Sequence, residues 1–108
     1  MIYMTGVKFI TENGVLCGFS VEGHSSQNCD DEQGKIVCAA VSSAAYMAAN
    51  TVLEILKEKA EVKIDNALMR LVVKSPKPET VAVLEGFKLH ITQLSLQYNT
   101  NIKIYSEV

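Results

Sequence analysis

The chain has 108 residues, 48% of them hydrophobic and 20% charged, which is an ordinary composition for a globular protein of one domain. A chain of this length can bury a core without metal ions or disulfide bonds, so neither disorder nor a cross-linked miniature fold is needed. The formal net charge of −2 provides no positive field to attract nucleic acid or an anionic membrane surface, and we expect neither as a partner.

The cysteine pattern and the amino terminus both point to the cytoplasm. The chain has an odd number of cysteines, namely Cys17, Cys29 and Cys38, and no two of them form a C-x-x-C pair. Both features argue against a disulfide framework. Residues 1–10 alternate in character and lack the basic and apolar runs of a secretory signal. The uncharged stretch 36–53 is long enough to span a membrane, but its alanines and polar residues make it weakly apolar, and we interpret it as a buried helix of a soluble protein.

The first predicted element is a β-hairpin. Residues 1–11 and 15–23 are rich in β-forming side chains, and Asn13-Gly14 between them is a strong signal for a two-residue turn. One face of the second run is apolar and consists of Val15, Cys17, Phe19 and Val21. This alternation is typical of a half-buried strand, so we expect Cys17 in the core.

A loop and a long helix are predicted next. The segment from Ser25 to Gly34 is polar, acidic and without periodicity, which predicts a loop of ten residues. Apolar residues then recur at spacings of three and four, which predicts a helix over 36–57. Alanine and serine line its first half and permit close approach of another backbone, in a crowded core or a subunit interface. Tyr46 and Met47, deeper in this helix, are expected in the core or at an interface.

The second half of the chain predicts a further hairpin, helix and strand. Segments 61–65 and 68–74 form the hairpin, which turns at Asp65-Asn66. Pro78 suits the first turn of a helix that ends near Asn99, and residues 102–104 predict a short closing strand. The order is ββαββαβ, so we expect a single domain over 1–108 with an α+β fold: two layers, a mixed or antiparallel sheet and two long helices.

One pair of residues suggests catalysis. Gly23-His24 ends a predicted strand and Cys38 falls in the first turn of the predicted helix, so the loop between them can bring the two side chains together. Unpaired N–H groups and the helix dipole in a first turn favour the thiolate, the reactive form of cysteine. A neighbouring imidazole can take the thiol proton and later deliver it to a leaving amine. His90 lies within the second predicted helix, and we assign it no function.

The same residues carry a resemblance to a known family. Gly23-His24 and the string Gly34-Lys35-Ile36-Val37-Cys38-Ala39-Ala40-Val41-Ser42 resemble the signature of Prp, the ribosomal-processing cysteine protease of Firmicutes and related bacteria. The signature consists of Gly-His, a short Gly-rich loop, and Asp-Ile-Val-Cys-Ala-Ala-Val-Ser. The length and the order of the predicted elements are also similar to those of this family.

The resemblance implies a role for each matching residue. His24 matches the general base of the family and Cys38 its nucleophile. Gly23 matches the residue that shapes the turn at the histidine. Ser42 matches the serine one helical turn beyond the cysteine, where it faces the same way as Cys38. Gly34 stands with Gly23 and Ser42 as a substrate-binding or supporting residue.

The reaction implied by the resemblance is hydrolysis of a peptide bond. In the family it removes a short N-terminal extension, ending in a hydrophobic motif that contains an aromatic residue, from a large-subunit ribosomal protein before ribosome assembly. The Cys38 thiolate would attack the scissile carbonyl, His24 would protonate the leaving amine, and N–H groups at the helix start would hold the oxyanion. The predicted loop from Ser25 to Gly34 would close over the peptide. Relatives form homodimers, which implies a homodimer here.

Two features depart from the family pattern. Lys35 stands where the family usually has Asp, so a carboxylate that orients His24 would have to come from Asp30, Asp31 or Glu32. The predicted loop is also longer than usual and carries Cys29.

Two alternatives to the protease remain. His24, Cys29 and Cys38 are the ligand types that zinc prefers, but they lack a close ligand pair and a fourth ligand. We therefore expect no metal and no cofactor. The other alternative is a non-catalytic, ribosome-associated or peptide-binding module of the same fold.

Overall fold

The computed structural model describes residues 4–23, 32–66 and 68–108. These residues form a five-stranded sheet and two long helices, so the predicted α+β fold with the order ββαββαβ is confirmed. The elements, in chain order, are β1 (Thr5–Glu12), β2 (Val15–Gly23), α1 (Glu32–Asn50), its π-helical extension η2 (Thr51–Ile55), β3 (Ala60–Asp65), β4 (Leu68–Val73), α2 (Pro78–Gln97) and β5 (Ile102–Glu107).

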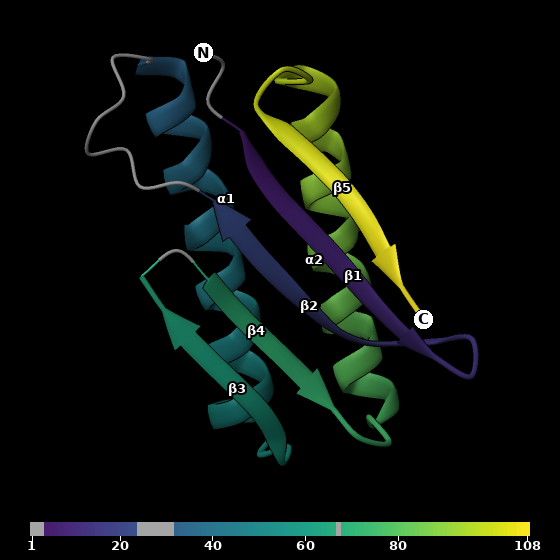
Figure 1. Ribbon diagram of the computed structural model, residues 1–108. Coiled ribbons are helices and arrows are strands. Elements are labelled where there is room, and N and C mark those ends of the chain that lie inside the picture. The colour runs from purple at the N-terminus through teal and green to yellow at the C-terminus, as the bar shows by residue number, and fades with distance from the viewer. Residues whose placement is uncertain (1–3, 24–31, 67) are drawn as a thin grey trace.

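The sheet has the strand order β3-β4-β2-β1-β5, and both helices lie on the same face of it (Figure 1). β1 pairs with β5 in parallel, and the other neighbouring strands are antiparallel. The mixed sheet and the two-layer arrangement agree with the prediction. This order places the second hairpin beside β2, although the long helix α1 separates the two in sequence.

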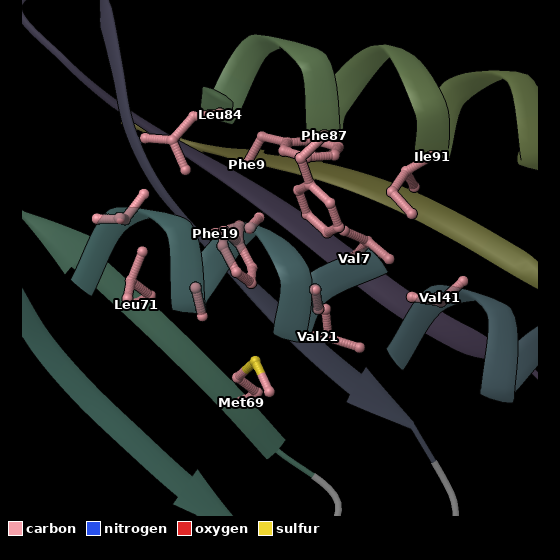
Figure 2. Close-up of a cluster of buried hydrophobic side chains, with 14 of the residues drawn as sticks. Val7, Phe9, Phe19, Val21, Val41, Met69, Leu71, Leu84, Phe87 and Ile91 are labelled. Carbon is pink, nitrogen blue, oxygen red and sulfur yellow. The ribbon is translucent and has the colours of Figure 1, made fainter. Parts of the chain in front are cut away.

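The core fills the space between the sheet and the helices (Figure 2). The rings of Phe9 and Phe19, from the two central strands, pack on Phe87 of α2 with centroid distances of 5.8 and 4.5 Å. α1 contributes buried residues at helical spacings, namely Val37, Val41, Ala45, Ala48 and Ala49. Because this stripe is fixed against the sheet, the residues next to it on α1 have defined directions.

By length and composition, the 24 residues Glu32–Ile55 could cross a membrane. The buried stripe of α1, however, packs on the sheet. One face of this helix therefore belongs to the core, and 33% of its most apolar window is buried.

α1 begins four residues earlier than predicted. Residues Glu32 to Gly34 are helical, so the predicted loop over Ser25 to Gly34 is wrong at its end; its remaining residues lie outside the described ones. Residues of this additional turn contact a segment that is distant in sequence. Gln33 Nε2 donates a hydrogen bond of 2.7 Å to Asn101 Oδ1, and Gly34 is buried. At the other end, Lys57 adopts a left-handed φ of 56° just beyond η2.

A β-bulge changes the predicted faces of β2. Ile10 pairs with Gly18 and Thr11 with Leu16, so Cys17 is the extra residue. The alternation shifts by one position there. As a result Leu16 joins the core cluster, whereas Val15, which the alternation placed on the apolar face, is 41% exposed. Cys17 is buried, as predicted.

The side chain of Glu58, which precedes α2 in the sequence, caps the amino terminus of that helix. Its Oε2 accepts hydrogen bonds from the Lys77 N–H at 2.8 Å and the Thr80 hydroxyl at 2.7 Å. These bonds hold the pKa of Glu58 below its ordinary value of 4.5.

We therefore expect Glu58→Ala to lower the melting temperature at neutral pH. Because the folded state favours the ionised carboxylate, its contribution is present above about pH 4.5 and is lost as the pH falls through the lower folded-state pKa. Thermal unfolding of both proteins from pH 7 to pH 3 measures this difference, which should shrink with acid. Glu85→Ala, at an exposed position of α2, is the control. A difference that does not change with pH contradicts the role of the charge.

Candidate active site

A pocket of about 150 Å³ lies where α1, the central strands and the second hairpin meet. The wall on α1 consists of Cys38, Ser42, Ala45 and Tyr46. The facing wall is the turn end of the second hairpin, with Ile64, Asp65, Asn66, Leu68 and Met69. Thr5, Val21 and Gly23 complete the lining from the central strands.

The helical spacing of α1 sets the direction of the Cys38 side chain. Val37 and Val41 are buried in the core, and Cys38 lies beside this stripe as a half-buried free thiol. Ser42 lies one turn further on and therefore shares the face of Cys38. The structure thus brings Cys38 and Ser42 together on one pocket wall.

Cys38 does not lie at the helix start. It is the seventh residue of α1, which places it in the second turn and about 9 Å along the axis from Glu32. The N–H of Cys38 is inside the helix, where the carbonyl of Gly34 is its partner. The predicted position of Cys38 in the first helical turn is therefore wrong, because α1 begins earlier than the sequence pattern indicates.

Gly23 brings the end of β2 into the same pocket. A Cβ added to Gly23 would be in ordinary van der Waals contact with Thr5, 3.4 Å from its Oγ1 and 3.5 Å from its Cγ2. Gly34, in contrast, is buried in α1 and does not line this pocket. His24, Cys29, Asp30 and Asp31 lie outside the described residues.

Several pocket residues were not predicted. Tyr46 and Met47 were expected in the core or at an interface. Tyr46 is 48% exposed on the pocket wall and Met47 is 68% exposed outside this pocket, so neither lies in the core. Asp65 brings a carboxylate to the pocket. Glu32, one of the carboxylates considered as the group that orients His24, does not line it. Among the described residues the hydroxyl of Thr5 is buried without a hydrogen-bond partner. The helical spacing of α1 brings Tyr46 to the pocket, whereas the sheet order brings Asp65 and Thr5, which no local pattern marks.

The two described cysteines differ in environment. The thiol of Cys17 donates to the carbonyl of Ile10 with an S···O distance of 3.5 Å, and burial raises its pKa. Cys38 is half-buried on the pocket wall.

We expect iodoacetamide at pH 8 to alkylate Cys38 in the folded protein at least about tenfold faster than Cys17, because the thiolate is the reacting form and must be accessible. Tandem mass spectrometry of tryptic peptides, taken over time, gives both rates; fragment ions are needed because Cys17 shares the peptide 9–35 with Cys29. In urea the two rates should become similar. Equal protection of Cys38 and Cys17 in the folded protein would show that the pocket does not admit a reagent.

Comparison with known proteins shows which family this chain matches. The family model for the cysteine protease Prp matches residues 4–103. A search among curated proteins finds no match. SMU.848 from Streptococcus mutans has a similar fold, with 22% identity and a TM-score of 0.83 over 96% of this chain and 97% of that one.

The essential ribosomal processing protease Prp from S. aureus also has a similar fold. Its complex with a substrate peptide matches at 17% identity with a TM-score of 0.85, over 96% of this chain and 100% of that one. Its complex with a covalently linked product peptide matches at 18% identity with a TM-score of 0.80, with the same coverage. At these identities the structural likeness shows the fold.

Proposed function

The chain belongs to the family of the cysteine protease Prp, and from this we propose that Cys38 is its catalytic nucleophile and His24 the general base. The observation that carries the assignment is the position of Cys38 as a half-buried thiol on the wall of a pocket. Among the described residues the other cysteine is Cys17, which is buried in the β-bulge. Gly23 lines the pocket, and His24 is the next residue of the chain.

In the proposed mechanism the imidazole of His24 takes the proton of the Cys38 thiol, and the thiolate adds to the carbonyl carbon of the scissile bond. The tetrahedral intermediate then collapses, the C–N bond breaks, and the leaving amine takes the proton from the imidazolium. The remaining thioester between the peptide acyl group and Cys38 is hydrolysed by water, which regenerates the thiol.

We propose that the substrate is the N-terminal extension of a large-subunit ribosomal protein, removed in the cytoplasm before ribosome assembly. The S. aureus relative is a ribosomal processing protease that has been captured with substrate and product peptides. The pocket supports a peptide with an apolar residue near the scissile bond, because much of its lining is apolar: Val21, Ala45, Ile64, Leu68 and Met69.

Incubation with a synthetic peptide that spans the extension junction tests this function. We expect one cleavage, at the junction, identified by the masses of the two products. A peptide of the same composition in scrambled order is the control and should remain intact. Binding of the junction peptide without cleavage would instead support the non-catalytic peptide-binding module.

We further propose that the protein is a homodimer that uses the groove between α1 and α2. This groove has a volume of about 730 Å³, and its α1 side is lined by small residues together with exposed Met47. Small side chains let a second copy approach closely. Sedimentation equilibrium should give a dimer mass for the wild type and a monomer mass for Met47→Lys. A monomer mass for the wild type at micromolar concentration contradicts this assembly.

A further inference from the structure

Among the described strands β3 forms one edge of the sheet, and β4 is its one partner there (Figure 1). Its residues from Glu61 to Asp65 are all exposed. Val62 and Ile64 lie opposite Leu71 and Met69, whose side chains are buried, so all four point to the helix-covered side of the sheet. Even so, Val62 is 43% and Ile64 60% exposed. Glu61, Lys63 and Asp65 of this strand are charged, so its apolar character is confined to the side that carries Val62 and Ile64. The unpaired backbone groups of an exposed edge strand are a template for pairing with another chain.

The exposed edge leads directly to the Cys38 pocket. Ile64 and Asp65, at the end of β3, line that pocket together with Cys38. Val62 lies two residues back, about 7 Å along the strand. Tyr46 of α1 is half-exposed on the opposite pocket wall. The edge of β3 is therefore continuous with the place where a scissile bond would meet the thiol.

The pairing of β3 with β4 determines which backbone groups are free. Asp65 and Leu68 pair directly across a turn of two residues, and such a pair exchanges both of its hydrogen bonds. Hydrogen-bonded and non-hydrogen-bonded pairs alternate along an antiparallel ladder, so Lys63 also bonds to β4. The N–H and C=O groups of Val62 and Ile64 consequently point away from β4, toward the free edge.

We propose that the peptide substrate binds as an added strand on the free edge of β3, with its backbone bonded to Val62 and Ile64 and its apolar side chains packed on theirs. This proposal rests on the proposed protease function. Strand addition supplies affinity through main-chain hydrogen bonds and selectivity through alternate side chains. A peptide held in this way extends along β3 into the pocket and brings a bond near its end to Cys38.

The first test is Val62→Pro, with Val62→Ala as the matched control for loss of the side chain. Proline removes the outward N–H of Val62 without breaking a bond to β4, so the fold should remain, as checked by circular dichroism. We expect the KM of Val62→Pro for the junction peptide to be at least about fivefold above that of Val62→Ala, with kcat within about twofold. Equal KM values in the two variants overturn the proposal.

The second test leaves the enzyme unchanged. Junction peptides with single N-methyl groups at successive residues are measured for binding to Cys38→Ala by calorimetry, which requires no cleavage. Strand addition predicts that methylation weakens binding at alternate residues, because only every second N–H faces β3. A loss without this alternation overturns the proposal.

If alternation appears but the wild type cleaves no junction peptide, strand addition stands and the protease function fails. If Val62→Pro changes the oligomer mass but not the KM, the edge joins two copies, which also overturns the proposal.

Discussion

Cys38→Ala is expected to lower kcat/KM for the junction peptide by at least about 10⁴-fold, with the fold unchanged. The thiolate forms the covalent bond to the substrate, and alanine has no group that can replace it. Product formation by chromatography at substrate concentrations below KM measures the loss. Because Cys38 is half-buried on the pocket wall rather than in the core, its truncation should change the melting temperature little.

Three further variants test whether the loss of activity is due to a pair formed by the Cys38 thiol and the His24 imidazole. Cys17→Ala removes the described thiol that is remote from the pocket, and its kcat/KM should stay near that of the wild type. His24→Ala should lose activity to a similar extent as Cys38→Ala. The double variant should lose little more than either single one, because groups that act as a unit are strongly non-additive. A Cys38→Ala protein that keeps more than about one tenth of the activity would exclude the thiol from the mechanism.

Gly18→Ala is expected to reduce the free energy of unfolding by about 3 kcal/mol. A Cβ at Gly18 would lie 2.3 Å from the carbonyl oxygen of Leu71 and 2.9 Å from the Cα of Val72, and both are backbone atoms of β4. Relief of this clash requires β2 and β4 to separate. Their pairing places the second hairpin beside the Cys38 pocket, so we also expect reduced peptide cleavage.

Urea denaturation of Gly18→Ala measures this loss, and Gly86→Ala is its control. Both are made in the Met47→Lys background, because Gly86 lines the groove proposed as the dimer interface. A Cβ at Gly86 of α2 meets nothing within 4 Å. Because glycine is unfavourable within a helix, Gly86→Ala should stabilise the protein by about 0.5 to 1 kcal/mol. Equal stabilities of the two variants contradict the close approach of β2 and β4.

The elements were predictable where the signal is local. Asn13-Gly14 marks the first hairpin and Pro78 the start of α2, and both elements form as predicted. The start of α1 was missed because residues 32–34 are outside the apolar periodicity, and the contact of Gln33 with Asn101, 68 residues away, is not visible in the local sequence. The bulge at Cys17 was missed because an extra residue interrupts an alternation that reads as continuous.

The site was predictable to the same degree. The spacing of Cys38 and Ser42 on one helix face follows from the sequence alone. Asp65, Ile64 and Thr5 come to the pocket through the pairing of β2 with β4 and with β1, which is a non-local property. The sequence therefore indicates the thiol, while the sheet order determines what surrounds it.

The most direct test of the mechanism is a junction peptide that ends in a chloromethyl ketone at the scissile position. This reagent alkylates the nucleophile that the bound peptide presents to it. Peptide mapping by tandem mass spectrometry locates the adduct on the folded wild-type protein. We predict a single adduct on the sulfur of Cys38, prevented by an excess of uncleavable junction peptide. An adduct on Cys29 alone, or a folded protein that remains unmodified, would contradict the assignment of Cys38 as the nucleophile.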